Sequence, residues 1–171
     1  MPTAVLAVAV ALLATACGPG ADGAGSGSPT AHLELRLLTS AAAGPCSRPP
    51  LTSAGPGRAC AMSGSGTYDL GPALAAVAPT RAEIHDDPVG PVLVVWLDGS
   101  GRQRLADVTR QAVGRRLAVL VQGRVLVAPE VQRPVTEGRM VLAVPTRLVA
   151  AQVAGALHAS ETAPSGAPEG P

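Results

Sequence analysis

The sequence contains no lysine, asparagine or phenylalanine, and aromatic residues make up 1% of its 171 residues. Without lysine there is no Schiff-base amine and no Walker-type phosphate loop, and without asparagine there is no acceptor for an N-linked glycan. The scarcity of aromatic side chains removes base stacking, and a formal net charge of +1 provides no field for nucleic acid. All 13 basic residues are arginine, a bias typical of GC-rich bacterial coding sequence. We therefore expect no nucleic-acid partner.

The first 16 residues are predicted to be a signal peptide. Ala4–Ala16 is an apolar run that is shorter than the ~20 residues of a membrane-spanning helix, and Cys17 follows it directly. A cysteine after Ala14-Thr15-Ala16 resembles a bacterial lipoprotein signal, in which the cysteine thiol receives the lipid. Ordinary secretion with cleavage near Ala16 is the alternative, because no basic residue precedes the run. We expect lipidation of Cys17 and a location on the extracytoplasmic face of the cell membrane.

Both ends of the remaining chain have the composition of flexible segments. Residues 17–30 are rich in Gly, Ser, Ala and Pro and predict a tether, and residues 159–171 predict a disordered tail. Gly18–Gly23 fits the G-x-G-x-x-G pattern, but no strand precedes it and no helix follows, so no dinucleotide site is expected. Residues 31–158 then form one domain of the usual size of roughly 100 to 150 residues.

Two cysteines remain once Cys17 is assigned to lipid. Cys46 and Cys60 lie in a segment rich in Gly, Pro and Ser, and an exported chain meets an oxidising compartment. A disulfide that staples the loop 46–60 is the natural pairing. A metal site or a redox pair is the alternative, although neither a CxxC spacing nor a nearby histidine supports it.

The most informative stretch is Val92–Pro129, which predicts a strand, a helix and a hairpin. Val92–Leu97 is an unbroken apolar run typical of a buried strand. Apolar positions then follow a helical period, with arginines between them, until Gly114. The hairpin turn is predicted at Gln122-Gly123, where glycine supplies a positive φ.

This stretch resembles the head subdomain of the first large periplasmic domain of the SecD and SecDF protein-export family. The ordered residues that carry the resemblance are Leu97, Asp98, Gly101, Leu105, Thr109, Gly114, Leu117-Ala118-Val119, Gly123-Arg124-Val125, Ala128, Pro129, Val135, Gly138 and Val141. Leu33–Leu38 and Thr67–Pro72 resemble upstream parts of the same domain, and Thr146–Leu157 resembles its closing helix. Three departures from the family pattern are Ala112 for Asn, Gln122 for Asp and Val127 for a small polar residue.

The pattern as a whole predicts an α+β fold with a mainly antiparallel sheet and two helices packed on one face. The expected helices span residues 101–114 and 146–158, the second with Thr146 as N-cap and Val149, Val153 and Leu157 on one face. The expected strands span residues 33–38, 67–70, 81–86, 91–97, the hairpin 116–128 and residues 139–144.

Few residues predict chemistry. His85-Asp86-Asp87 is the one candidate for a cation, but consecutive residues at a strand end rarely converge on one ion. No catalytic motif is found, so we expect no enzyme, no cofactor, no metal and no small-molecule substrate.

The resemblance implies a role in export, because the family's head subdomain contacts the emerging preprotein. We expect a non-enzymatic, lipid-anchored head module that binds secreted polypeptides or translocon subunits, with an exposed sheet edge available for strand addition. An adaptor lipoprotein of the cell envelope with one fixed protein partner and no export role is the alternative, since a fold alone does not determine function. A small-molecule carrier would need a deep apolar pocket.

Overall fold

The structure is a computed structural model that describes residues 32–158. The predicted signal peptide, Cys17, the tether and the C-terminal tail lie outside the described residues. The elements in chain order are β1 (Leu33–Ala43), β2 (Gly57–Cys60), β3 (Gly66–Val77), β4 (Pro79–Asp87), β5 (Gly90–Leu97), α1 (Gly99–Gln111), β6 (Leu117–Val121), β7 (Arg124–Val127), β8 (Arg139–Ala143) and α2 (Arg147–His158).

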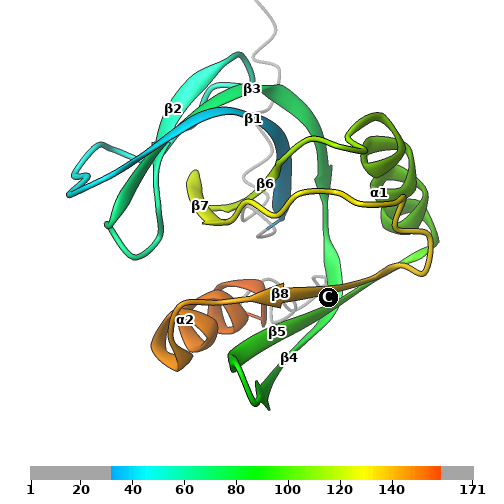
Figure 1. Cartoon of the computed structure of the whole chain (residues 1–171). Coiled ribbons are helices and arrows are strands. Elements are labelled where there is room, and N and C mark those ends of the chain that lie inside the picture. The colour runs from blue at the N-terminus through cyan, green and yellow to red at the C-terminus, as the bar shows by residue number, and fades with distance from the viewer. Residues whose placement is uncertain (1–31, 159–171) are drawn as a thin grey trace, which may run out of the picture.

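The strands form two antiparallel sheets, which confirms the α+β class but corrects the expectation of a single sheet. One sheet has five strands in the order β2-β3-β1-β6-β7, and the other has three in the order β4-β5-β8. The chain passes from one to the other where β3 runs through Ala78 into β4 (Figure 1). Pro79 lacks a backbone donor and so cannot continue the ladder of β3 as an inner strand would.

The two helices occupy different positions, so the expectation that both cover one face of one sheet is also corrected. Helix α2 packs against β4 and β5, whereas α1 contacts β3 and β5 and spans the side of the molecule between the two sheets (Figure 1). Thr146 caps α2 as predicted, because its Oγ1 accepts a hydrogen bond of 3.2 Å from the Val149 N–H.

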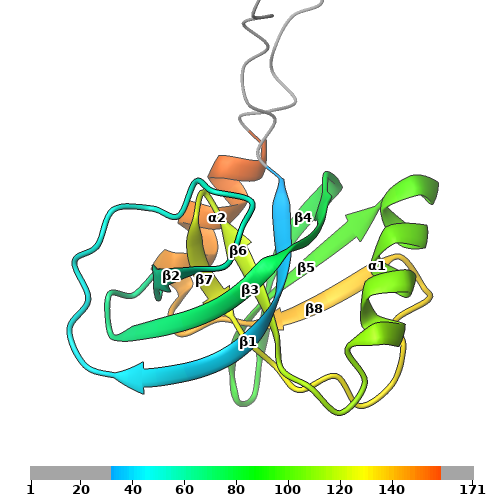
Figure 2. The ribbon, with the colours of Figure 1, turned by 90° about the horizontal axis from the view of Figure 1, so that it is seen from above.

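The main core lies between the sheets and the helices. The strand β1 contributes Leu33 and Leu35, and α2 contributes Val149, Val153 and Leu157, all less than 9% exposed. Burial of these side chains on one face of α2 agrees with the predicted helical period. The last described residues of α2 and the first of β1 lie at the same end of the molecule (Figure 2).

A second, smaller cluster lies on the other side of the five-stranded sheet. Alternate residues of β6 explain it, because Leu117, Val119 and Val121 point into the main core while Ala118 and Leu120 join the second cluster. Every residue of β6 is therefore buried, which is why its sequence is a continuous apolar run rather than an alternating one.

The segment between Cys46 and Cys60 covers the second cluster. The predicted disulfide is present, with the two Cα atoms 5.5 Å apart. The segment is not wholly a loop, since its last residues form β2, and Leu51 packs against the cluster. The Leu51 N–H donates a 3.0 Å hydrogen bond to the Gly123 carbonyl, which joins the stapled segment to the β6–β7 hairpin.

Gly123 is required at this contact for two reasons. Its φ is +72°, and a Cβ placed on it would lie 2.4 Å from the Leu51 carbonyl oxygen. Gln122 also has a positive φ, of 49°, so the departure from the family's Asp falls on a position that favours Asn or Asp.

Several elements are longer or shorter than the sequence predicted. Strand β1 continues to Ala43 and β3 covers Gly66–Val77, and the added residues of β1 pair with residues 66–69 of β3, for example Ala41 with Tyr68 and Ala43 with Gly66. Helix α1 ends at Gln111 rather than near Gly114, since residues 112–114 form the helix cap, with Gly114 at a φ of +73°. No helix within residues 32–158 is long and apolar enough to cross a membrane.

Arg36 is the one arginine of the described chain that is fully buried, with 0% of its surface exposed. Its guanidinium pairs with Glu34 and donates to the carbonyls of Ser53, Gly55 (2.6 Å) and Gly71 (3.1 Å). The side chain thus joins β1 to two residues of the stapled segment and to one residue of β3. A buried charge is tolerated in a protein only when it is paired and hydrogen-bonded in this way.

We predict that Arg36→Met destabilises the fold strongly, by about 3 kcal/mol, because the substitution removes the hydrogen bonds to three carbonyls and leaves Glu34 without its arginine. Urea unfolding followed by circular dichroism measures the loss. Arg58→Met is the matched control, since Arg58 pairs with Asp69 in solvent, and it should change the midpoint little. Equal midpoints for the two variants would contradict the prediction.

Candidate functional site

Two adjacent cavities open beside β8, and we call them together the β8 groove. Their volumes are about 290 and about 580 Å³, and they share Pro129, Val141 and Leu142 in their lining. Apolar side chains dominate both of them. The lining also includes Leu105, Thr109, Leu117, Val119, Leu126, Ala128 and Val135, together with the charged Glu130, Arg133 and Arg139.

One wall of the groove is the chain that follows β7. The Val131 N–H donates to the Arg115 carbonyl, and Pro129 and Val131 accept from the N–H groups of Leu117 and Gly114, all at 2.9 Å. These bonds hold the segment against residues 114–117, and β8 forms the opposite wall.

Strand β8 is paired on one side only. It is hydrogen-bonded to β5, in a register that places Leu142 opposite Leu93 and Met140 opposite Val95. The bonds from Leu97 to Gly138 and from Val144 to Pro91 show that the even-numbered residues of β8 exchange hydrogen bonds with β5. The backbone groups of the odd-numbered residues, Arg139, Val141 and Ala143, consequently point away from β5.

Charged side chains lie at one end of the groove. Glu130, Arg133 and Arg139 contribute to its lining and are exposed. Within residues 32–158, neither Arg133 nor Arg139 has an ion-pair or hydrogen-bond partner for its side chain. This end of the groove therefore carries two positive charges and one negative charge, and its two arginines are available to a carboxylate.

The structure brings eight of the residues that carry the family resemblance together at this groove: Leu105, Thr109, Leu117, Val119, Ala128, Pro129, Val135 and Val141. Thr109 is buried, and its Oγ1 donates to the Leu105 carbonyl at 2.7 Å and accepts from the Val135 N–H at 2.9 Å. The hydroxyl joins α1 to the wall of the groove, which explains a polar residue at a position that is 2% exposed.

The other motif residues shape the backbone around the groove rather than line it. Asp98 is the N-cap of α1, accepting from the Gly101 N–H at 2.6 Å, and Leu97 packs against the main core. A Cβ on Gly101 would lie 3.1 Å from the Leu97 Cβ. Gly138 has a φ of +69° and lies against Arg102 at the turn that leads into β8.

The cation candidate His85-Asp86-Asp87 does not converge. His85 lies 3.2 Å from Glu83, Asp86 pairs with Arg147, and Asp87 accepts from the Val89 N–H. In the part of the chain that the structure describes, no three His, Cys, Asp or Glu side chains are grouped to hold a metal.

Arg36 was not predicted from the sequence to have a role, although a lone charge in an apolar strand is the signal that could have marked it. Tyr68 and Val141 were named for the family resemblance but not as residues of a groove. Tyr68 lines the larger cavity, and Val141 is 53% exposed on the edge strand of the groove. Their place at the groove has no local signal, because it depends on which strand becomes an edge.

Comparison with known proteins identifies the family. Residues 74–161, a little over half of the chain, match the family described as SecDF, P1 head subdomain. The chain belongs to the SecDF P1 head family. This confirms the resemblance that the motif residues suggested, for the head subdomain itself.

Curated relatives match over short segments. The protein translocase subunit SecD of Acidaminococcus fermentans is 42% identical over 48 residues, which cover 28% of this chain and 12% of that protein. The translocase subunit SecDF of Thermus thermophilus is 36% identical over 77 residues, which cover 43% of this chain and 10% of that protein. The chain therefore spans about a tenth of the length of the relatives that it matches.

Solved structures give the same assignment for the fold. A structure of SecDF, described as a membrane component that enhances protein export, has a TM-score of 0.55 at 25% identity, covering 75% of this chain and 62% of that one. A second, of SecDF in a super-membrane-facing form, has a TM-score of 0.53 at 23% identity, covering 77% of this chain and 18% of that one. The head subdomain of SecDF is periplasmic and non-catalytic.

We predict that Thr109→Val loosens the wall of the groove, because the Val135 N–H loses its acceptor at a cost of about 1 to 3 kcal/mol. Amide hydrogen exchange at Val135 measures the change and should become faster. Thr109→Ser keeps the hydroxyl and should keep the protection. If the valine and serine variants exchange at the same rate, the hydroxyl does not hold the wall.

A second prediction concerns pH. The Gly101 N–H, and after it the Ser100 hydroxyl, lower the pKa of Asp98 below its ordinary value. The carboxylate thus stabilises the folded state fully above the unfolded pKa of about 3.9, and this contribution is lost as pH falls through the lower folded pKa.

Asp98→Asn retains a capping side chain that does not titrate. The stability difference between the native chain and this variant should be constant above about pH 5 and should shrink below about pH 4. Urea unfolding at a series of pH values measures it. A difference that stays constant down to about pH 2.5 would contradict the assigned pKa shift.

Proposed function

We propose that this chain is a non-enzymatic, lipid-anchored extracytoplasmic module that binds exported polypeptides in the β8 groove. The observation that carries the proposal is the groove itself, an apolar cleft between β8 and the chain after β7. Eight of the residues that carry the family resemblance line it, among them Thr109, Leu117, Ala128 and Pro129. The relatives are subunits of the protein translocase, so an extended, exported chain is the class of ligand that the family suggests.

Three features support a location outside the cytoplasm. Disulfides persist in oxidising compartments, and the Cys46–Cys60 disulfide ties together a segment with little apolar mass. Family membership points to the same side of the membrane. The sequence before Cys17 has the spacing of a lipoprotein signal, which would anchor the domain through the residues before β1.

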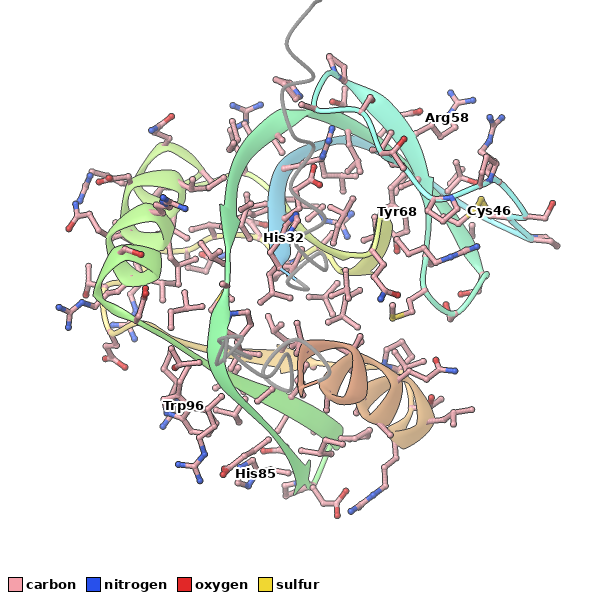
Figure 3. The ribbon with its side chains drawn as sticks, turned by 180° about the vertical axis from the view of Figure 1, so that it is seen from behind. His32, Cys46, Arg58, Tyr68, His85 and Trp96 are labelled. Carbon is pink, nitrogen blue, oxygen red and sulfur yellow. A yellow bond between two sulfur atoms is a disulfide. The ribbon has the colours of Figure 1, made fainter. Side chains whose placement is uncertain are left out.

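The adaptor alternative rests on a different surface, the outer face of the three-stranded sheet. Trp96 lies on this face with the Arg81 guanidinium 5.1 Å from its ring, and Figure 3 shows Trp96 and His85 directed away from the rest of the molecule. Tryptophan is enriched at protein interfaces, and Trp96 is partly exposed. A single partner that Trp96→Ala releases, together with no affinity for unfolded chains, would favour this alternative.

The proposal is tested by site-specific photo-cross-linking in cells. A photoreactive residue at Val141 should capture newly exported polypeptides, because this position is 53% exposed at the groove. The matched control is Leu148 on α2, which is 69% exposed but outside the groove, and it should capture few. Cys17→Ala tests the anchor separately, by release of the protein from the membrane fraction.

Two outcomes would contradict the proposal. One is the absence of any captured polypeptide at Val141 when the protein is abundant. The other is equal capture at Val141 and Leu148, which would indicate random encounter. Capture of translocon subunits at Val141 without exported chains would replace the ligand by the export machinery.

A further inference from the structure

We propose that the β8 groove binds its client as an added β-strand, with the client's backbone hydrogen-bonded to Arg139, Val141 and Ala143. This inference rests on the proposed function and specifies how the client is held and which segments qualify. A segment of about five residues with alternating apolar side chains and an acidic residue at one end is the ligand class.

Strand β8 presents a row of backbone groups on the side away from β5. Because the even-numbered residues of β8 exchange hydrogen bonds with β5, three odd-numbered residues present their N–H and C=O groups to the other side. Within residues 32–158 these groups have no hydrogen-bond partner. A row of unpaired strand groups is the template on which extended peptides are added. A small apolar ligand would leave these groups unpaired.

The five-stranded sheet offers no edge comparable with β8. Its two edge strands, β2 and β7, meet, because Ala61 forms a bridge with Val125 and the Met62 N–H donates to the Val125 carbonyl at 2.8 Å. The Leu51 N–H covers the hairpin tip in the same way. In the three-stranded sheet, the opposite edge strand β4 ends in Asp86 and Asp87, and charged residues discourage pairing at an edge.

The two faces of a strand added to β8 would meet different surroundings. Met140 and Leu142 of β8 are buried, so every second side chain of an added strand would point to the same side, toward Leu105, Val119 and Leu126. The intervening side chains would lie beside the half-exposed Val141 and tolerate polar residues. This alternation selects segments with apolar residues at every second position.

The charged residues at one end of the groove favour one orientation of the client along β8. Arg133 and Arg139 lack partners among the described side chains, so an acidic residue at that end of the client gains an ion pair. Glu130 lines the same end, but a lysine beside the two arginines would meet their like charges, so an acidic residue at that position should be preferred to a basic one.

The occupant is another polypeptide rather than a flanking segment of this chain. Residues 18–31 and 159–171 contain no Leu, Ile, Val, Met or aromatic residue with which to fill an apolar groove. The apolar residues 4–16 belong to the predicted signal peptide. A peptide with the sequence of residues 4–16 is therefore included below as a competitor.

The test uses a fluorescent eight-residue peptide with alternating valine and threonine between terminal glutamates, titrated with the whole chain and followed by anisotropy. Two further peptides carry N-methyl groups on either the valine or the threonine amides. Only one of these sets of N–H groups faces β8 in a given strand direction, so one methylated peptide should bind about tenfold or more weakly and the other should bind normally. Loss with methylated threonines indicates antiparallel addition, and loss with methylated valines indicates parallel addition.

Protein variants provide the complementary measurement. Val141→Pro removes one N–H from the free edge while the neighbouring residues keep their bonds to β5, and it should weaken binding roughly fivefold or more. Val141→Thr keeps both the N–H and the branched shape and should bind normally. If the proline variant does not fold, the methylated peptides still decide the question.

Each outcome separates this inference from the proposed function. Equal binding of both methylated peptides, or equal weakening of both, would overturn strand addition while leaving polypeptide binding in place. Failure of the unmodified peptide and of an unfolded secreted protein to bind would overturn both. Stronger binding by the residue 4–16 peptide, or dimerisation of the chain that Val141→Pro abolishes, would assign the β8 edge to the chain itself and overturn the proposed client.

Discussion

The pairing of the chain after β7 with residues 114–117 is the interaction on which the groove depends. The backbone groups of Pro129 and Val131 form hydrogen bonds with Gly114, Arg115 and Leu117. These three residues lie between the C-terminal end of α1 and the start of β6. Had the same segment paired with β8, the free edge of β8 would have been covered. A buried threonine hydroxyl then fixes the rest of this wall to α1. The apolar gap beside β8 follows from these contacts.

The five-stranded sheet is stabilised differently. Its outer cluster is small, and the segment that covers it is poor in large side chains, so burial of apolar surface alone contributes little there. The disulfide and the Arg36 guanidinium replace that contribution, one by restricting the chain and the other by donating to the Ser53 and Gly55 carbonyls of the covering segment. The contacts of Ala61 and Met62 with Val125 close the two edges of this sheet on one another, so the open edges belong to the three-stranded sheet, where β8 is the one beside the groove.

The sequence predicted the parts of the fold that have a local signal. The apolar run of β5, the N-cap of α2 and the hairpin turn at Gln122-Gly123 each depend on residues within a few positions of one another. The division into two sheets has no such signal, because it is decided by the bend at Ala78-Pro79 and by long-range pairing. The second half of β1, which ends in three alanines, was missed for a related reason, since it is defined by its pairing with residues 66–69 of β3 rather than by a local pattern.

The sequence predicted the region and the type of the candidate site, but not its geometry. The motif residues pointed to the right region, but as single positions they did not indicate a groove; Asp98, Gly101 and Gly138 shape the backbone, and only some of the others line it. The edge for strand addition was expected without its location, because which strand lacks a neighbour depends on sheet order. The two unpaired arginines at the groove could not be told from solvated surface residues until their surroundings were known.

The central claim is that β8 is the binding edge of this head subdomain. Its most direct test is amide hydrogen exchange of the whole chain in the presence of a saturating unfolded secreted protein. The account predicts that the amides of Arg139, Val141 and Ala143 become protected, while Met140 and Leu142, already bonded to β5, change little. Protection of Trp96 and its neighbours on the outer face instead, or no change along β8 at saturation, would contradict it.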